Sequence, residues 1–209
     1  MNPSLEKQLN LRINKLEKAC LRNNFAFDVV EDEAGVREFV NQLIHPGDVV
    51  TVGGSMSLFE TGVISMLEDM PNIEYLDRYN TDDDTEVMHK AFDSDVYITS
   101  TNAITMQGEL YNVDGRGNRV AAMIYGPEKV LVVVGLNKIV EDLQEAKTRV
   151  EKIAAPANAI RLNKQTPCMI TGECAHCKNN CLCNHFVTIQ GSHIQGRIHI
   201  LLVKKILGY

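Results

Sequence analysis

The sequence predicts an α/β protein in which a mainly parallel sheet lies between two layers of helices, a three-layer α/β/α arrangement. Short β-branched runs alternate with helical patterns along the chain, as in sheets whose parallel strands are joined by helical crossovers. The 209 residues are 44% hydrophobic and 23% charged, which is typical of a globular protein with a sizeable core.

The first half of the chain supplies most of this alternation. Apolar residues at spacings of three and four from Leu5 to Cys20 predict an amphipathic first helix. Apolar β-branched runs indicate the strands, and breaks such as Pro46-Gly47 separate the elements. In order, we expect a strand at 25–30, a helix through 36–43, a strand at 48–52, a helix through 58–67, a strand at 73–76, a short helix at 85–93 and a strand at 95–99.

The second half contains the strongest strand signal, the run KVLVVVG at 129–135, after a helical pattern at 118–126. A long helix carrying Ile139 and Val150 on its apolar face should follow and end before Pro156. The run IHILLV at 198–203 predicts a last strand. The three aspartates at 82–84 are interpreted as a solvated helix-capping turn rather than a metal site.

Charge and hydropathy exclude several classes of protein. The net charge of −6 argues against a nucleic-acid or anionic-membrane partner. The first 20 residues contain no continuous apolar stretch, so no signal peptide is predicted. No segment approaches the ~20 apolar residues that a membrane span needs. We therefore expect a cytoplasmic protein, in which thiols stay reduced and a disulfide framework is disfavoured.

A glycine- and serine-rich loop, GGSMS at 53–57, directly follows the expected buried strand at 48–52. Gly53 and Gly54 would let the backbone approach a ligand, and Ser55 and Ser57 could add hydroxyl donors for a phosphate or carboxylate. A tight strand–helix turn with Ser55 as N-cap is the alternative. The spacing matches neither a dinucleotide fingerprint nor a Walker A loop, so no nucleotide cofactor is indicated.

The segment 99–123 is unusually rich in hydrogen-bonding side chains on a glycine-containing backbone. As a substrate pocket, it would use Glu109 or Asp114 for acid/base work, and Arg119 to bind an anion. Asn102 and Asn118 would add polar contacts. Turn signals at 114–115 and 117–118 leave open a β-hairpin with residues 109–113 as one arm.

Five of the six cysteines fall within sixteen residues, with the spacing C-x5-C-x2-C-x3-C-x-C. Four thiolates can hold a tetrahedral zinc ion or an iron–sulfur cluster, and a C-x-x-C pair places two of them on one metal with little strain. Cys168, Cys174, Cys177 and one of Cys181 or Cys183 could complete such a set. Uncoordinated thiols in a surface loop are the competing interpretation.

The run from 102 to 140 resembles the LUD domain, named for lactate-utilisation proteins. The segments at 53–62, 155–158, 167–174 and 207–209 also match its pattern. The resemblance implies a fold similar to the sugar-phosphate isomerase and CoA-transferase group. It implies a LUD α/β domain at 1–165, with a cysteine-rich segment and last strand at 166–209 packed on it. Cys183, followed by an asparagine, looks like the cysteine typical of the family.

Relatives of this kind take part in oxidising L-lactate to pyruvate, typically with separate iron–sulfur partner subunits. The resemblance therefore implies a protein of lactate or hydroxy-acid utilisation that binds a small anionic metabolite, with an iron–sulfur cluster or zinc at the cysteines. Two alternatives stay open: a non-catalytic accessory subunit of an iron–sulfur oxidoreductase complex, and an isomerase or CoA-transferase-like enzyme. Whether the chain is an enzyme and whether it forms a homo-oligomer also stay open.

Overall fold

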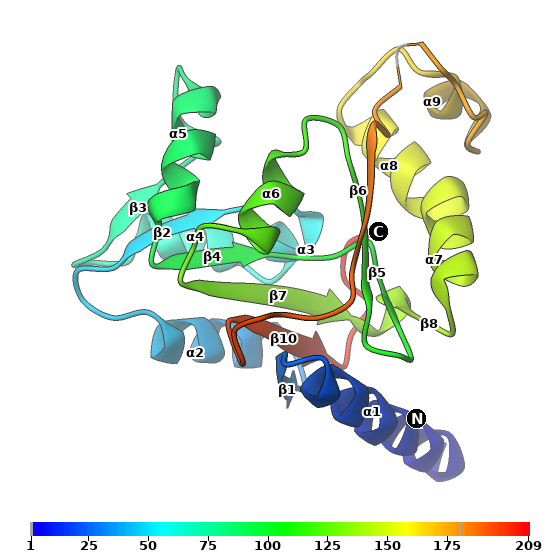
Figure 1. Ribbon diagram of the computed structural model, residues 1–209, viewed down its shortest axis with the longest axis horizontal. Coiled ribbons are helices and arrows are strands. Elements are labelled where there is room, and N and C mark those ends of the chain that lie inside the picture. Colours follow the sequence, from blue (N-terminus) through cyan, green and yellow to red (C-terminus); the bar gives the residue numbers. More distant parts are fainter. Residues whose placement is uncertain (1, 180) are drawn as a thin grey trace.

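A computed structural model describes residues 2–179 and 181–209 (Figure 1). Within them, a central sheet of six parallel strands confirms the α/β prediction; its order is β1-β10-β7-β4-β2-β3. The strands are β1 (Ala26–Val30), β2 (Val49–Val52), β3 (Glu74–Leu76), β4 (Val96–Thr99), β7 (Lys129–Gly135) and β10 (Ile198–Val203). The runs at 129–135 and 198–203 are interior strands of the sheet. Helices or the smaller sheet bury both of their faces, which explains why both runs are almost continuously apolar.

Helices cover both faces of this sheet. Side chains of β7 alternate between two cores: Val130, Val132 and Val134 point into one, and Leu131 and Val133 into the other. On the second face lie α2 (Glu33–Leu43), α3 (Met56–Glu60) and α4 (Val63–Glu68). The first face is covered by α1 (Pro3–Arg22) and α6 (Asn118–Ile124), and α5 (Asp84–Lys90) stands on the same side, over β2 and β4 (Figure 1).

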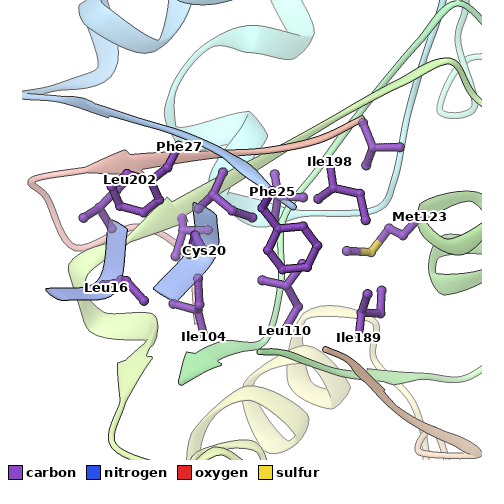
Figure 2. Packing of buried hydrophobic residues seen from close by; sticks show 14 of the residues in the cluster. Leu16, Cys20, Phe25, Phe27, Ile104, Leu110, Met123, Ile189, Ile198 and Leu202 are labelled. Carbon is purple, nitrogen blue, oxygen red and sulfur yellow. The ribbon is translucent and has the colours of Figure 1, made fainter. Parts of the chain in front are cut away.

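A smaller sheet also packs on the first face. Its strands are β5 (Ala103–Thr105), β6 (Leu110–Asp114), β8 (Ile139–Val140) and β9 (His185–Ile189), in the order β8-β5-β6-β9. Figure 2 shows Ile104 and Leu110 of this sheet meeting Leu16 and Cys20 of α1. The hairpin alternative is correct in one arm, since residues 110–113 lie in β6. Its turn is wrong, because β6 pairs with the preceding β5 through a turn at 106–109, and the predicted turn at 114–118 leads into α6 instead.

The long helix predicted through Ile139 and ending before Pro156 is wrong at both ends. Ile139 pairs in β8, and α7 (Leu143–Arg149) begins only after the capping side chain of Asp142. The helical run then continues through a π-helical segment, Val150–Ala154, into α8 (Ala155–Arg161). Because proline has no N–H to donate, the widened turn just before Pro156 lets the helix continue past it.

Three local predictions have clear outcomes. The helix predicted through 58–67 divides at Gly62, whose φ of 72° is left-handed, into α3 and α4. The aspartate run does cap a helix, since the side chain of Asp83 accepts from the backbone N–H groups of Thr85 and Glu86. The helix predicted at 85–93 is α5 followed by a 3₁₀ turn, Ala91–Asp93.

The segment from 166 onwards contributes to both sheets, through β9 and β10. Its short helix α9 (Pro167–Thr171) packs against α8, and the cysteine-containing loop follows. None of the helices in the described residues is long and apolar enough to cross a membrane.

Candidate functional site

A cavity of about 450 Å³ opens at the carboxyl ends of the central strands. This is the edge at which open α/β sheets bind ligands. Its wall combines Gly54–Met56 after β2, Arg78 after β3, Ser100–Asn102 after β4 and Lys138 after β7. Residues 113–119, helix α8, the loop 181–184 and Tyr209 complete it. The two polar regions that the sequence singled out, near 55 and near 115, thus share one cavity.

The structure brings together most of the predicted pocket residues. Those that line the cavity are Gly54, Ser55, Asn102, Asp114, Asn118, Arg119 and Cys183. Gly53 lies behind the wall, where a Cβ atom would meet the Tyr97 hydroxyl at 2.6 Å. Ser57 is fully buried behind the wall, and Ser55 stands at the N-cap of α3 without a side-chain capping bond.

Glu109 is not brought to the cavity. It stands at the hairpin turn, where its Oε2 accepts from the Thr105 hydroxyl at 3.0 Å. Asp114 lies at the opposite end of β6, five residues away, and a strand rises about 3.3 Å per residue. The hairpin therefore separates the two predicted acids by most of the length of the strand, and only Asp114 faces the cavity.

Asp114 and Arg119 form a buried ion pair in the cavity wall. Nε and Nη2 of Arg119 donate to Oδ1 of Asp114 at 2.9 and 2.6 Å, and Oδ2 of Asp114 accepts from the backbone N–H of Val120 at 3.0 Å. Nη1 of Arg119 also donates to the Asn112 side chain and to the Ser100 carbonyl. Because these donors are already engaged, the pair braces the wall rather than offering a free cation.

Lys138, which sequence reasoning missed, ends the 3₁₀ turn Leu136–Lys138 that follows β7. It is 3% exposed, and its Nζ donates to the hydroxyl oxygens of Ser57 and Ser100, each at 2.8 Å. Burial, together with Arg149 and Arg119, lowers its pKa to about 7, although Glu60 acts in the opposite direction. A lone lysine in GLNK carries no spacing signal; its place after the strongest predicted strand was the available clue.

Arg78 is the second charged cavity residue that the sequence did not reveal. It follows β3, and its Nη1 is next to Gly54, where an added Cβ would lie 3.5 Å away. Its Nε is buried and finds no hydrogen-bond partner within the described part of the chain. A single arginine after a short strand has no pattern from which this could be predicted.

The cavity is strongly positive. Among its described lining residues, Asp114 is the one acidic side chain, whereas the basic side chains are Arg78, Arg116, Arg119, Lys138, whose pKa is about 7, Arg161 and Lys164. Some of these are engaged: Arg116 pairs with Asp84, and Arg161 donates to Tyr209 and Asn158. The remaining excess of positive charge favours an anionic ligand.

The five clustered cysteines lie near one another beside this cavity, and Cys181 and Cys183 form part of its wall. Burial and the neighbouring thiols of Cys181, Cys174 and Cys168 raise the pKa of Cys183 to about 12. Contact with the Cys181 side chain is the main cause that raises the pKa of Cys177. Cys168 is buried in α9 beside the Thr166 hydroxyl.

These thiols do not form a finished ligand cage. In residues 2–179 and 181–209, no three side chains of Cys, His, Asp or Glu converge closely enough to hold a metal ion. All six cysteines are unpaired thiols. A metal at this position would therefore require the loop carrying Cys174, Cys177 and Cys181 to close around it.

Comparison with known proteins places this geometry in a family. A family model, the LUD domain, matches residues 13–203. A solved DUF162 family protein from Deinococcus radiodurans shares the fold, with 14% identity, a TM-score of 0.54 and coverage of 93% of this chain and 97% of that chain. A partial match to eIF2B beta from Chaetomium thermophilum has 14% identity and a TM-score of 0.39, over 56% of this chain and 45% of that one. No curated protein matches the chain.

Proposed function

The chain belongs to the LUD domain family, and we propose on that premise that it binds a small anionic metabolite of the hydroxy-acid or oxo-acid class in the cavity. The resemblance seen in the sequence links this family to lactate utilisation, and the positive cavity suits a carboxylate. The observation that carries the proposal is the Arg78 guanidinium, which borders the cavity and makes no ion pair or side-chain hydrogen bond within the described residues.

An arginine fork matches a carboxylate in geometry as well as in charge. The volume of about 450 Å³ lies in the usual range for small-molecule sites. It exceeds what a three-carbon acid fills, so ordered water or a second group of a larger acid would share the cavity.

The test is calorimetric titration of the protein with L-lactate, pyruvate and inorganic phosphate. We expect at least one of these anions to bind, and Arg78→Ala to weaken that binding ~10-fold or more, as expected for loss of a charge-assisted pair. Arg22→Ala, which removes an equal charge from the exposed end of α1, should leave affinity unchanged. Equal affinity in Arg78→Ala and the unaltered protein would refute the assignment.

A metal or iron–sulfur cluster at the cysteines is the second candidate, favoured by the gathering of five thiols at the rim of the same cavity. Cys168, Cys174, Cys177 and Cys183 would hold it after closure of the loop, and it would supply electron transfer or structural cross-linking. An iron–sulfur partner subunit would then dock beside it, with this chain as an accessory subunit.

Anaerobic purification followed by metal analysis and visible absorption tests this candidate. Iron with a broad visible band indicates a cluster, zinc without colour indicates a structural site, and absence of both metals refutes the candidate. Cys174→Ser should lower the bound metal sharply. Cys20→Ala is the matched control, because Cys20 is a thiol on the buried side of α1, in the hydrophobic core and away from the cluster (Figure 2).

A further inference from the structure

We propose that Lys138 is a nucleophilic amine that forms an imine with the carbonyl carbon of a 2-oxo acid bound in the cavity. This inference deepens the anion-binding function proposed above and rests on it. It adds a reacting residue and narrows the substrate class from anions in general to acids with a carbonyl group next to the carboxylate.

The position of Lys138 supports this role. The residue lies at the carboxyl end of β7, in the floor of a cavity that Arg78 also lines. Its hydrogen-bond partners are two hydroxyls, Ser57 and Ser100, rather than a carboxylate. A carboxylate would hold the lysine as an ammonium ion, whereas a hydroxyl can either accept from an ammonium or donate to a neutral amine. The site therefore accommodates the reactive, neutral form.

The surrounding charges favour that neutral form. The charged groups that act on Lys138 are Arg149 of α7, Arg119 of α6 and Glu60 of α3. Burial has the largest effect on the Lys138 pKa, and two of these three groups are cationic and add to it, so the pKa falls to about 7. An ordinary lysine with a pKa of about 10.4 would be almost entirely protonated at neutral pH, and a protonated amine has no lone pair with which to attack.

The reaction balances without an oxidant or a cofactor. Nζ of neutral Lys138 forms a bond to the carbonyl carbon, and the carbonyl oxygen takes up a proton as one N–H proton is released. The resulting carbinolamine then loses its hydroxyl group and the second N–H proton as water, leaving a carbon–nitrogen double bond. The Ser100 hydroxyl, which lines the cavity 2.8 Å from Nζ, is placed to relay these protons. Arg78 would hold the substrate carboxylate.

The experiment is reductive trapping of the full-length protein at pH 7 with pyruvate and cyanoborohydride, followed by peptide mass spectrometry. We expect the reduced adduct on Lys138, at a yield at least ten-fold above that on any other lysine. Lys138→Met and Lys138→Arg should both abolish it; the arginine variant keeps a cation in place if the methionine variant fails to fold. Lys152→Met removes an exposed lysine outside the cavity and should leave trapping unchanged.

A second probe, propionaldehyde, separates the two proposals because it has a carbonyl group but no charge. If pyruvate binds by calorimetry but neither probe modifies Lys138, the imine is refuted and anion binding stands. If propionaldehyde modifies Lys138 but pyruvate neither binds nor is trapped, the 2-oxo acid is refuted as substrate; anion binding itself is refuted only when L-lactate and phosphate fail to bind as well. Selective modification of Lys138 by both probes supports the inference.

Discussion

Nη2 of Arg119 lies 2.6 Å from Oδ1 of Asp114, and both side chains are about nine-tenths buried. The pair joins the end of β6 to helix α6 and so holds two walls of the cavity together. Asp114→Asn would leave the arginine charge buried and unpaired, which destabilises a protein by about 3–5 kcal/mol. Urea denaturation measures this loss.

The control is Asp84→Asn, which breaks the exposed pair with Arg116 and should change the free energy of unfolding by less than about 1 kcal/mol. If Asp114→Asn leaves stability unchanged but abolishes ligand binding or turnover, the residue acts on the ligand rather than as a brace.

Lys138 should make stability depend on pH in a defined direction. Its pKa is about 7 in the folded protein and near 10.5 in the unfolded chain, so between these values the unfolded chain binds more protons. The free energy of unfolding should therefore rise with pH across this window, by at most about 1.4 kcal/mol per pH unit. Denaturation of the unaltered protein and of Lys138→Met at matched pH isolates this contribution, because the other groups titrate in both. Parallel curves for the two proteins would contradict the lowered pKa.

The hairpin turn packs tightly against α1 at Gly108. Its φ is 80°, and an added Cβ would lie 2.9 Å from the backbone nitrogen of Cys20. Gly108→Ala combines left-handed strain with a backbone clash and should destabilise the protein by more than ~2 kcal/mol. Gly172 has a similar φ of 76° with open space around it, so Gly172→Ala should show only the ~1–2 kcal/mol of backbone strain. Equal losses of stability in the two variants would mean that an added Cβ at residue 108 does not clash with the backbone of α1.

Leu110 anchors the smaller sheet in the main core and is fully buried (Figure 2). Leu110→Ala should destabilise the protein by about 2–5 kcal/mol, because it removes buried apolar surface and leaves a cavity. Ile170→Ala, at a position 83% exposed, should change stability by less than ~0.5 kcal/mol. Thermal and urea unfolding of the two variants measure the contrast; a small effect of Leu110→Ala would mean that the sheets fold independently.

The central sheet could be predicted because each of its strands can be recognised from the residues of that strand alone. β7 and β10 are continuous apolar runs, and no other element type suits such short segments between helices. β8 and β9 were missed because β8 is two residues long and β9 is mostly exposed, so both depend on pairing with their neighbours rather than on their own pattern.

The candidate site was predicted in outline but not in its charges. The loop near 55 follows a strand and the loop near 115 precedes a helix. In a parallel sheet such loops lie at the carboxyl ends of the strands, so the topology predicts that both meet at that edge of the sheet. Lys138 and Arg78 are single residues without a motif, and their importance comes from burial and from missing partners, which only the folded chain shows. Glu109 was expected in the pocket because the sequence does not show where the hairpin turns. The turn comes before β6, so it carries Glu109 to the end of the strand that is far from the cavity.

Cys181 and Cys183 belong to the wall that encloses the ligand volume, and this has a thermodynamic consequence. If oxidation, metal uptake or docking of another protein moves residues 181–184, the cavity wall moves with them, and the affinity for a bound ligand changes. Linkage requires the converse by the same factor. A ligand whose binding depends on the position of this wall must therefore shift, by the same factor, any binding equilibrium at these sulfur atoms.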